Sequence, residues 1–170
     1  MPRATPAPPI AWHRRLSARF RVLPDHLILG AQKSGTTQLD RILSRNPGVL
    51  HRAWKETRTL VDPHATANRC RGYQELAARA RRFERERGHP MRAGDACPFY
   101  LFHPESPAIA RRVLGPDIRF VVLLRDPVHR AWSHHRHEVR LGVEHLDFIE
   151  AIDREEDRLA PDAAPDAPIS

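Results

Sequence analysis

Two short segments of this chain carry cationic and hydroxyl side chains at spacings that suit anion binding. The first reads Gly-Ala-Gln-Lys-Ser-Gly-Thr-Thr over residues 30–37 and follows the apolar run His26–Leu29. Gly35 lets backbone N–H groups turn toward an anion, and the two threonines after it add hydroxyl donors. A helix that begins there points its positive end at the same place. The loop therefore predicts a phosphate or sulfate site, with Lys33 as a mobile cation.

The order of residues in this loop differs from that of a Walker A loop, in which the lysine follows the second glycine. Here Lys33 precedes Gly35, although the physical basis of anion binding is related. The plainer alternative is an ordinary turn between a strand and a helix, with a lysine on the surface. We favour the anion site because several phosphate-compatible features coincide within the loop.

The second segment reads Val-Val-Leu-Leu-Arg-Asp-Pro over residues 121–127, and Ser133 lies eight residues after its arginine. The apolar run Ile118–Leu124 predicts a buried strand that leads into Arg125. Open α/β sheets bind phosphorylated ligands at the carboxyl ends of their strands, so two such segments predict a ligand with two separated anionic groups. Arginine suits a phosphate because its planar fork can donate two hydrogen bonds. The alternative is an arginine paired with Asp126 or another surface carboxylate.

The two segments resemble the nucleotide-binding motifs of sulfotransferases that use 3′-phosphoadenosine 5′-phosphosulfate (PAPS) as sulfuryl donor. The loop motif of that superfamily, GxxKxGTT, is matched by Gly30, Lys33, Gly35, Thr36 and Thr37. The second motif, RDPxxRxxSxYxH, is matched by Arg125, Asp126, Pro127, Arg130, Ser133 and His137. His135 stands where that motif has its tyrosine. The resemblance covers about residues 24–158, and the stretch 95–104 is similar to the bacterial and heparan-sulfate-type branch.

The resemblance implies a PAPS-dependent sulfotransferase with two catalytic residues, Lys33 and Glu56. Lys33 would stabilise the negative charge that grows on the leaving oxygen, and Glu56 would be the general base for the acceptor. The donor-binding residues that it implies are Lys33, Ser34, Gly35, Thr36, Thr37, Arg125 and Ser133. It implies no metal. Glu56 is the retained part of a Glu-Pro-His-Phe-Phe pattern, and its alternative role is a solvated carboxylate paired with Lys55 or Arg58.

The rest of the chain alternates between short apolar runs and helix-like segments, which predicts an α/β fold with a mainly parallel sheet covered on both faces. Strands are predicted at His26–Leu29, Val49–Ala53 and Ile118–Leu124. Helices are predicted at Thr37–Arg45, Tyr73–Arg87, Pro107–Leu114 and Val128–Leu141, and a loop with aromatic anchors at 94–102. The resemblance implies the three-layer fold of P-loop NTPases, incomplete at its carboxyl-terminal end.

Composition and charge place the chain among globular proteins with acidic ligands. It has 170 residues, 41% hydrophobic residues and a formal net charge of +7. We expect a basic disordered tail over 1–23, a sulfotransferase domain over 24–158, and a Pro/Ala/Asp-rich loop or truncated end over 159–170. The apolar runs are too short for a transmembrane segment. Cys70 and Cys97 form no CxxC pattern, which fits a reducing compartment and a cytoplasmic location.

Several functions are compatible with these features. The first is a PAPS-dependent transferase that modifies a hydroxyl or amine of a glycan or small molecule. The second is a truncated, catalytically inactive relic that binds a nucleotide or anion. A P-loop kinase is weakened by the lysine position and by the lack of a clear strand-end Asp for magnesium. A nucleic-acid partner is not expected, because no recognition motif is present. The histidines between His129 and His145 are predicted as a polar helix face rather than a metal site.

Overall fold

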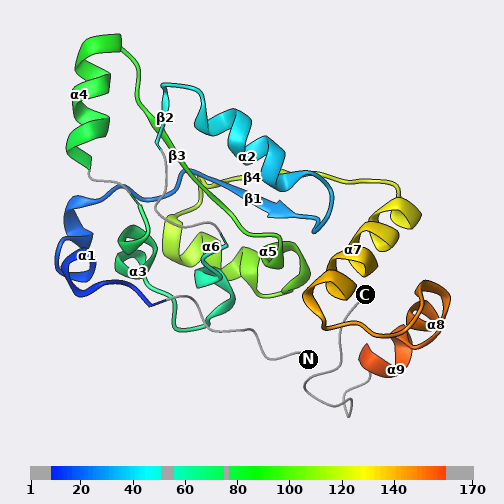
Figure 1. Cartoon of the computed structure of the whole chain (residues 1–170). Coiled ribbons are helices and arrows are strands. Elements are labelled where there is room, and N and C mark those ends of the chain that lie inside the picture. The colour runs from blue at the N-terminus through cyan, green and yellow to red at the C-terminus, as the bar shows by residue number, and fades with distance from the viewer. Residues whose placement is uncertain (1–8, 51–55, 75–76, 160–170) are drawn as a thin grey trace.

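The computed structural model describes residues 9–50, 56–74 and 77–159, which contain a four-stranded parallel sheet (Figure 1). The strands are β1 (His26–Gly30), β2 (Val49–Leu50), β3 (Arg92–Ala96) and β4 (Arg119–Val122). Their order across the sheet is β2-β3-β1-β4, so β1 pairs in parallel with both β3 and β4. The predicted α/β class with a parallel sheet is confirmed.

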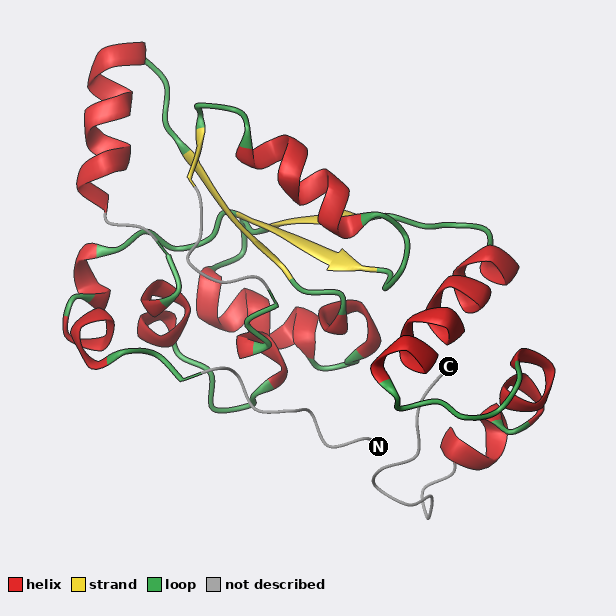
Figure 2. Cartoon of the chain, viewed as in Figure 1, coloured by secondary structure: helices red, strands yellow, loops and turns green. Residues whose placement is uncertain are grey.

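Helices lie on both faces of this sheet. Figure 2 shows α2 over one face and α5 and α6 over the other. The described helices are α1 (Trp12–Leu16), α2 (Thr36–Ser44), α3 (Ala67–Gly72), α4 (Ala77–Arg87), α5 (Phe99–Phe102), α6 (Ser106–Leu114), α7 (Pro127–Leu141), α8 (Phe148–Asp153) and α9 (Glu155–Leu159), with 3₁₀ turns η1 (Ala18–Phe20) and η2 (Thr59–Val61). Within the described ranges, none of these helices combines the length and the apolar composition that crossing a bilayer requires.

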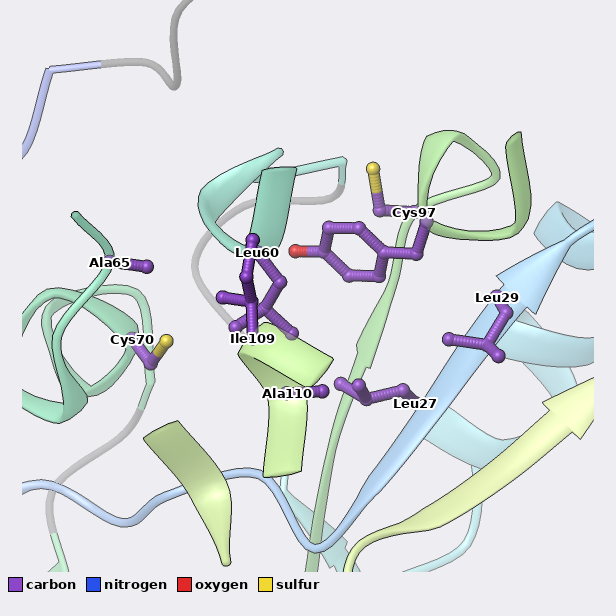
Figure 3. Packing of buried hydrophobic residues seen from close by; sticks show 9 residues of the cluster. Leu27, Leu29, Leu60, Ala65, Cys70, Cys97, Ile109 and Ala110 are labelled. Atoms are coloured by element: carbon purple, nitrogen blue, oxygen red, sulfur yellow. The ribbon is translucent and has the colours of Figure 1, made fainter. Parts of the chain in front are cut away.

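The middle strand β1 is buried on both faces, as expected for the centre of a parallel sheet. Successive side chains of a strand point to opposite faces, so Leu27 and Leu29 share one face and Ile28 points to the other. Leu27 and Leu29 belong to a buried cluster with Ile109 of α6 and with Tyr100 (Figure 3). This core fixes the carboxyl end of β1, where the lysine-containing loop begins.

The strand β3 occupies residues where the sequence analysis predicted a loop from Gly94 onward. Three of its five residues are alanine or glycine, which have low strand propensity, but intrinsic propensity says little about a strand that lies between two neighbours. Gly94 lies opposite His26 in the ladder, and a Cβ atom at Gly94 would collide with the imidazole ring of His26. This glycine therefore permits close packing rather than a turn. The remainder of the predicted loop contains α5.

The strand β4 is shorter and more exposed than the apolar run Ile118–Leu124 predicted. Its residues Phe120 and Val122 are 37% and 44% exposed, and Leu124, beyond the strand, is 81% exposed. The strand lies at one end of the described sheet and has β1 as its only neighbour there. An end strand shares its faces with fewer packed side chains than a central one, which explains why an apolar sequence remains exposed.

Most helix predictions hold. The helices predicted at Thr37–Arg45, Pro107–Leu114 and Val128–Leu141 are present as α2, α6 and α7, with bounds that differ by at most one residue. The helix predicted at Tyr73–Arg87 is shorter, because α4 begins at Ala77. Of the strand predicted at Val49–Ala53, β2 covers the first two residues, and the rest lies outside the described residues.

Of the tail predicted over 1–23, residues 1–8 lie outside the described residues, and the remainder contains short helical elements. They include α1 and η1, which pack beside α3. Arg14 donates hydrogen bonds to the carbonyl oxygens of Gly72 (2.7 Å) and Gln74 (2.8 Å), and Arg21 donates to Gln74 (2.7 Å). These contacts join segments more than 50 residues apart, so the local sequence does not reveal them.

A buried ion pair ties the last described helix to the end of α7. Glu144 accepts hydrogen bonds from the backbone N–H groups of His145 and Leu146, and its carboxylate lies 2.6 Å from Arg158 of α9. Burial acts to raise the pKa of Glu144, but Arg158 and the two N–H groups outweigh it and hold the pKa at about 2. The folded protein therefore favours the ionised carboxylate.

Replacing Glu144 by glutamine is expected to lower the free energy of unfolding at neutral pH by roughly 3 kcal/mol. The pKa of about 2 lies below the ordinary value of 4.5, so the wild type keeps this stabilisation above pH 4.5 and loses it as the pH falls toward 2. Chemical denaturation at several pH values should show a difference in the free energy of unfolding between the wild type and Glu144→Gln. This difference should shrink as the pH falls from 4.5 toward 2. Glu156→Gln, on the exposed surface of α9, is the matched control. A pH-independent difference would contradict the ion-pair explanation.

Candidate active site

The carboxyl ends of three neighbouring strands bring predicted site residues to one edge of the sheet. The lysine loop (residues 30–37) leaves β1, and Arg125 follows β4. The backbone N–H of Glu56 donates to the carbonyl oxygen of Ala96 at the end of β3 (3.1 Å). Figure 1 shows that the loop between β1 and α2 lies on the side of the sheet toward α7. This edge is where open α/β sheets bind ligands.

The lysine loop is tied to the segment after β4 by two backbone hydrogen bonds. The N–H of Ala31 donates to the carbonyl of Leu123, and the N–H of Leu123 donates to the carbonyl of Gly30, each at 2.8 Å. Lys33 and Gly35 have left-handed backbones, with φ of 65° and 94°. A left-handed residue directly before a right-handed helix turns N–H groups toward one side, which makes a concave anion site.

The start of α2 completes the chemistry of this loop. Its first turn has no acidic residue and its N-cap makes no side-chain hydrogen bond, so its first N–H groups and positive end are suited to an anion. Ser34 Oγ is buried and has no hydrogen-bond partner among the described residues. An unsatisfied buried hydroxyl costs about 1–3 kcal/mol, which an anion oxygen would remove. Thr36 is buried and Thr37 is exposed.

Arg125 brings the second motif into contact with the first. Its Nη1 donates to the carbonyl oxygen of Lys33 at 3.2 Å, which joins residues 92 positions apart. Asp126 has a different role, because it caps α7 by accepting from the backbone N–H of His129 (2.9 Å). Its carboxylate also lies 3.1 Å from the His129 ring. Ser133 lies half-buried on the second turn of α7. The hydrogen bond to Lys33 shows that the guanidinium of Arg125 points at the lysine loop.

A buried polar network that the sequence analysis missed begins at Thr57, the residue after Glu56. Thr57 Oγ1 and the Tyr100 hydroxyl both donate to Asp95 Oδ2, at 2.9 Å and 2.7 Å. All three residues are at most 4% exposed. Burial, with the charge of Asp95, raises the pKa of Tyr100, so its phenol stays protonated and donates. The network fixes the backbone next to Glu56, which is half-buried with φ of 56°.

The histidines of α7 do not form a uniform polar face, contrary to the prediction. His134 and His135 are buried, at 7% and 8% exposure. Burial lowers the pKa of His134, the charges of Arg130 and Lys33 act in the same direction, and Glu138, 3.3 Å away, opposes them. In the part of the chain that the structure describes, no cluster of three or more His, Cys, Asp or Glu could hold a metal.

Comparison with known proteins shows what this chain is similar to. Residues 23–157 match the family described as "Sulfotransferase domain". The crystal structure of a sulfotransferase from Alicyclobacillus acidocaldarius is similar, with a TM-score of 0.63 and 31% identity, over 85% of this chain and 62% of that chain. The membrane-associated sulfotransferase kil1 of Dictyostelium discoideum is 29% identical over 125 residues, which is 74% of this chain.

The chain spans only part of these relatives, namely 25% of the length of kil1 and 62% of the solved bacterial chain. The family match nevertheless includes the lysine loop, the end of β3 and the segment around Arg125. Because this match extends over most of the chain and includes both sequence motifs, the protein belongs to the sulfotransferase domain family.

Proposed function

We propose that this protein binds PAPS and transfers its sulfuryl group to a hydroxyl or amine of an acceptor. Membership of the sulfotransferase family supports sulfuryl transfer as the reaction class. The observation that carries the proposal is the hydrogen bond from Arg125 to the carbonyl of Lys33, because it joins the cationic segments of two motifs at one edge. A donor with an anionic group at each end would span them.

The residues at this edge fit such a donor. The lysine loop offers the N-terminus of α2 and a buried Ser34 hydroxyl without a partner among the described residues, both of which suit the 5′-phosphosulfate. Arg125 and Ser133 would hold the 3′-phosphate, since a guanidinium and a hydroxyl are its ordinary partners. The proposed donor-binding set is Lys33, Ser34, Gly35, Thr36, Thr37, Arg125 and Ser133.

The donor supplies an activated sulfuryl group, and its transfer leaves negative charge on a phosphate oxygen. Lys33 would stabilise this charge, because a cation placed in advance lowers the barrier most where charge develops. Glu56 would accept the proton of the attacking hydroxyl or amine. The backbone hydrogen bond to Ala96 and the buried network that includes Thr57 would keep Glu56 in place. Because Lys33 supplies the positive charge, the proposed step requires no metal.

The proposed acceptor is a glycan or a small molecule, and the net charge of +7 suits an anionic glycan. We propose a cytoplasmic location from the two cysteines, which are free and buried. Burial, followed by the charge of Asp95, raises the pKa of both Cys70 and Cys97 to about 12, so both thiols stay neutral.

Nucleotide binding tests the two-anion site directly. 3′-Phosphoadenosine 5′-phosphate is expected to bind more tightly than AMP or ATP, because it presents anions at both ends. Arg125→Ala should weaken its binding by roughly 1.5–3 kcal/mol, about 10- to 150-fold, and leave AMP binding unchanged. Isothermal titration calorimetry measures both affinities.

Arg85→Ala removes an exposed arginine of α4, a helix that Figure 1 shows far from this edge, and serves as the matched control. Equal affinities of the wild type for AMP and the 3′-phosphorylated nucleotide would contradict the two-anion site. An Arg125→Ala variant that still prefers the 3′-phosphorylated nucleotide over AMP as strongly as the wild type does would also contradict it.

A nucleotide-binding module without turnover is the second candidate. Leu124 and Val128 are 81% and 65% exposed, on either side of Arg125. This part of the edge is open to water, which weakens electrostatic stabilisation of a transition state. Binding of the 3′-phosphorylated nucleotide without any transfer from PAPS would favour the module over the enzyme.

A further inference from the structure

The N-terminal part of the described structure presents a row of large apolar side chains to solvent. Trp12, Leu16 and Phe20 are 73%, 73% and 56% exposed. Trp12 and Leu16, four residues apart in α1, lie on one side of that helix, and Phe20 ends the adjoining turn η1. Three large apolar groups gathered in one exposed segment indicate a surface for interaction. We name residues 9–21 the N-terminal platform.

Hydrogen bonds and packing contacts hold the N-terminal platform against the rest of the protein. Arg14 and Arg21 donate to backbone carbonyl groups of Gly72 and Gln74. Ala18 is 3% exposed, and Ile10 packs so closely on Gly72 that a Cβ there would meet it at 2.8 Å. The apolar row therefore projects from a supported surface and not from a loose tail.

The charged residues within the platform itself are all basic. Arg15 and Arg19 are exposed, and the guanidinium of Arg19 lies 4.6 Å from the centre of the Phe20 ring. The sequence has no acidic residue before Asp25, and α3 behind the platform has none. Exposed tryptophan, leucine and phenylalanine beside arginines are the composition of segments that lie in the interface of an anionic bilayer.

We propose that the N-terminal platform docks the protein on the surface of an anionic phospholipid bilayer. Trp12, Leu16 and Phe20 would enter the interfacial region, while Arg15 and Arg19 would contact lipid phosphates. Figure 1 shows α1 and α7 at opposite ends of the molecule, so docking leaves the donor-binding edge away from the lipid. The inference does not depend on the proposed transferase reaction.

Cosedimentation of the full chain with vesicles tests the proposal. The wild type is expected to pellet with vesicles of phosphatidylcholine mixed with phosphatidylglycerol, and to remain in solution with phosphatidylcholine alone. High salt should release it, because arginine–phosphate attraction is screened. A blue shift of tryptophan fluorescence with the anionic vesicles should accompany binding, since Trp12 would leave water.

Two variants separate the apolar and the ionic contributions. Trp12→Ala/Leu16→Ala/Phe20→Ala should weaken binding at least about tenfold, because three apolar contacts are lost. Arg15→Glu/Arg19→Glu should weaken it by more than about tenfold, since each arginine near an anionic surface contributes about fivefold. The matched controls are Leu141→Ala/Ile149→Ala and Arg85→Glu/Arg87→Glu, which change equally exposed residues elsewhere.

Each variant must retain the circular dichroism spectrum and the melting temperature of the wild type, which shows that the fold is intact. The control variants should bind vesicles like the wild type. Failure of the wild type to bind anionic vesicles would overturn the proposal, as would equal binding to neutral vesicles. A wild-type dimer that the triple variant separates, without vesicle binding, would assign the apolar row to a second copy of this chain instead.

Discussion

Replacing Lys33 by alanine is expected to lower kcat for sulfuryl transfer by about 10²–10³-fold, the effect of removing one group placed to stabilise developing charge. The affinity for 3′-phosphoadenosine 5′-phosphate should change by about fivefold or less, as for a solvent-exposed ion pair. The two effects differ because the charge of Lys33 matters most in the transition state. Single-turnover transfer from PAPS and calorimetry measure them separately.

Lys33→Arg keeps the charge but changes its shape, so it should restore only part of the transfer rate. Arg87→Ala, at the exposed end of α4, is the control for loss of a positive charge. Equal losses of affinity and turnover in Lys33→Ala would show that this lysine holds the bound donor rather than stabilising the transition state.

The lysine loop and the start of α7 were predictable because their signals are local. Gly35 has φ of 94°, which only glycine adopts readily, and it directly precedes the first turn of α2. Asp126 caps α7, and Pro127 occupies its first turn, where a missing N–H costs nothing. Such features depend on a few neighbouring residues, so the sequence alone locates both motifs.

The parts that were not predictable depend on long-range contacts. Gly94 looked like a loop residue, yet the His26 ring of the neighbouring strand requires a glycine there. The apolar sequence of β4 suggested burial, but its place at one end of the described sheet leaves it exposed. The hydrogen bond between Thr57 and Asp95 joins residues 38 positions apart, and neither residue type indicates which residue it will contact. In each case, residues distant in the sequence determine the local structure, the exposure or the hydrogen bonding of the position.

Replacing Glu56 by glutamine is expected to reduce transfer to the acceptor by about 10²–10⁴-fold, which is the usual contribution of a positioned general base. Glutamine has nearly the same shape, so the backbone with φ of 56° and its hydrogen bond to Ala96 should be retained. Nucleotide affinity should therefore stay at the wild-type value. Single-turnover transfer and calorimetry on the same preparation measure the two quantities.

The buried network supports the backbone beside Glu56 independently of the Glu56 carboxylate. Because Thr57, Asp95 and Tyr100 hold the adjacent backbone, loss of the Glu56 charge should leave the local structure and the melting temperature unchanged. Glu86→Gln, an exposed carboxylate paired with Arg82 on α4, is the control for a carboxylate with only a surface role. Transfer by Glu56→Gln at the rate of that control would return Glu56 to a surface ion pair and require another base. A large loss of transfer with unchanged melting and nucleotide binding leaves proton removal as the role of this carboxylate.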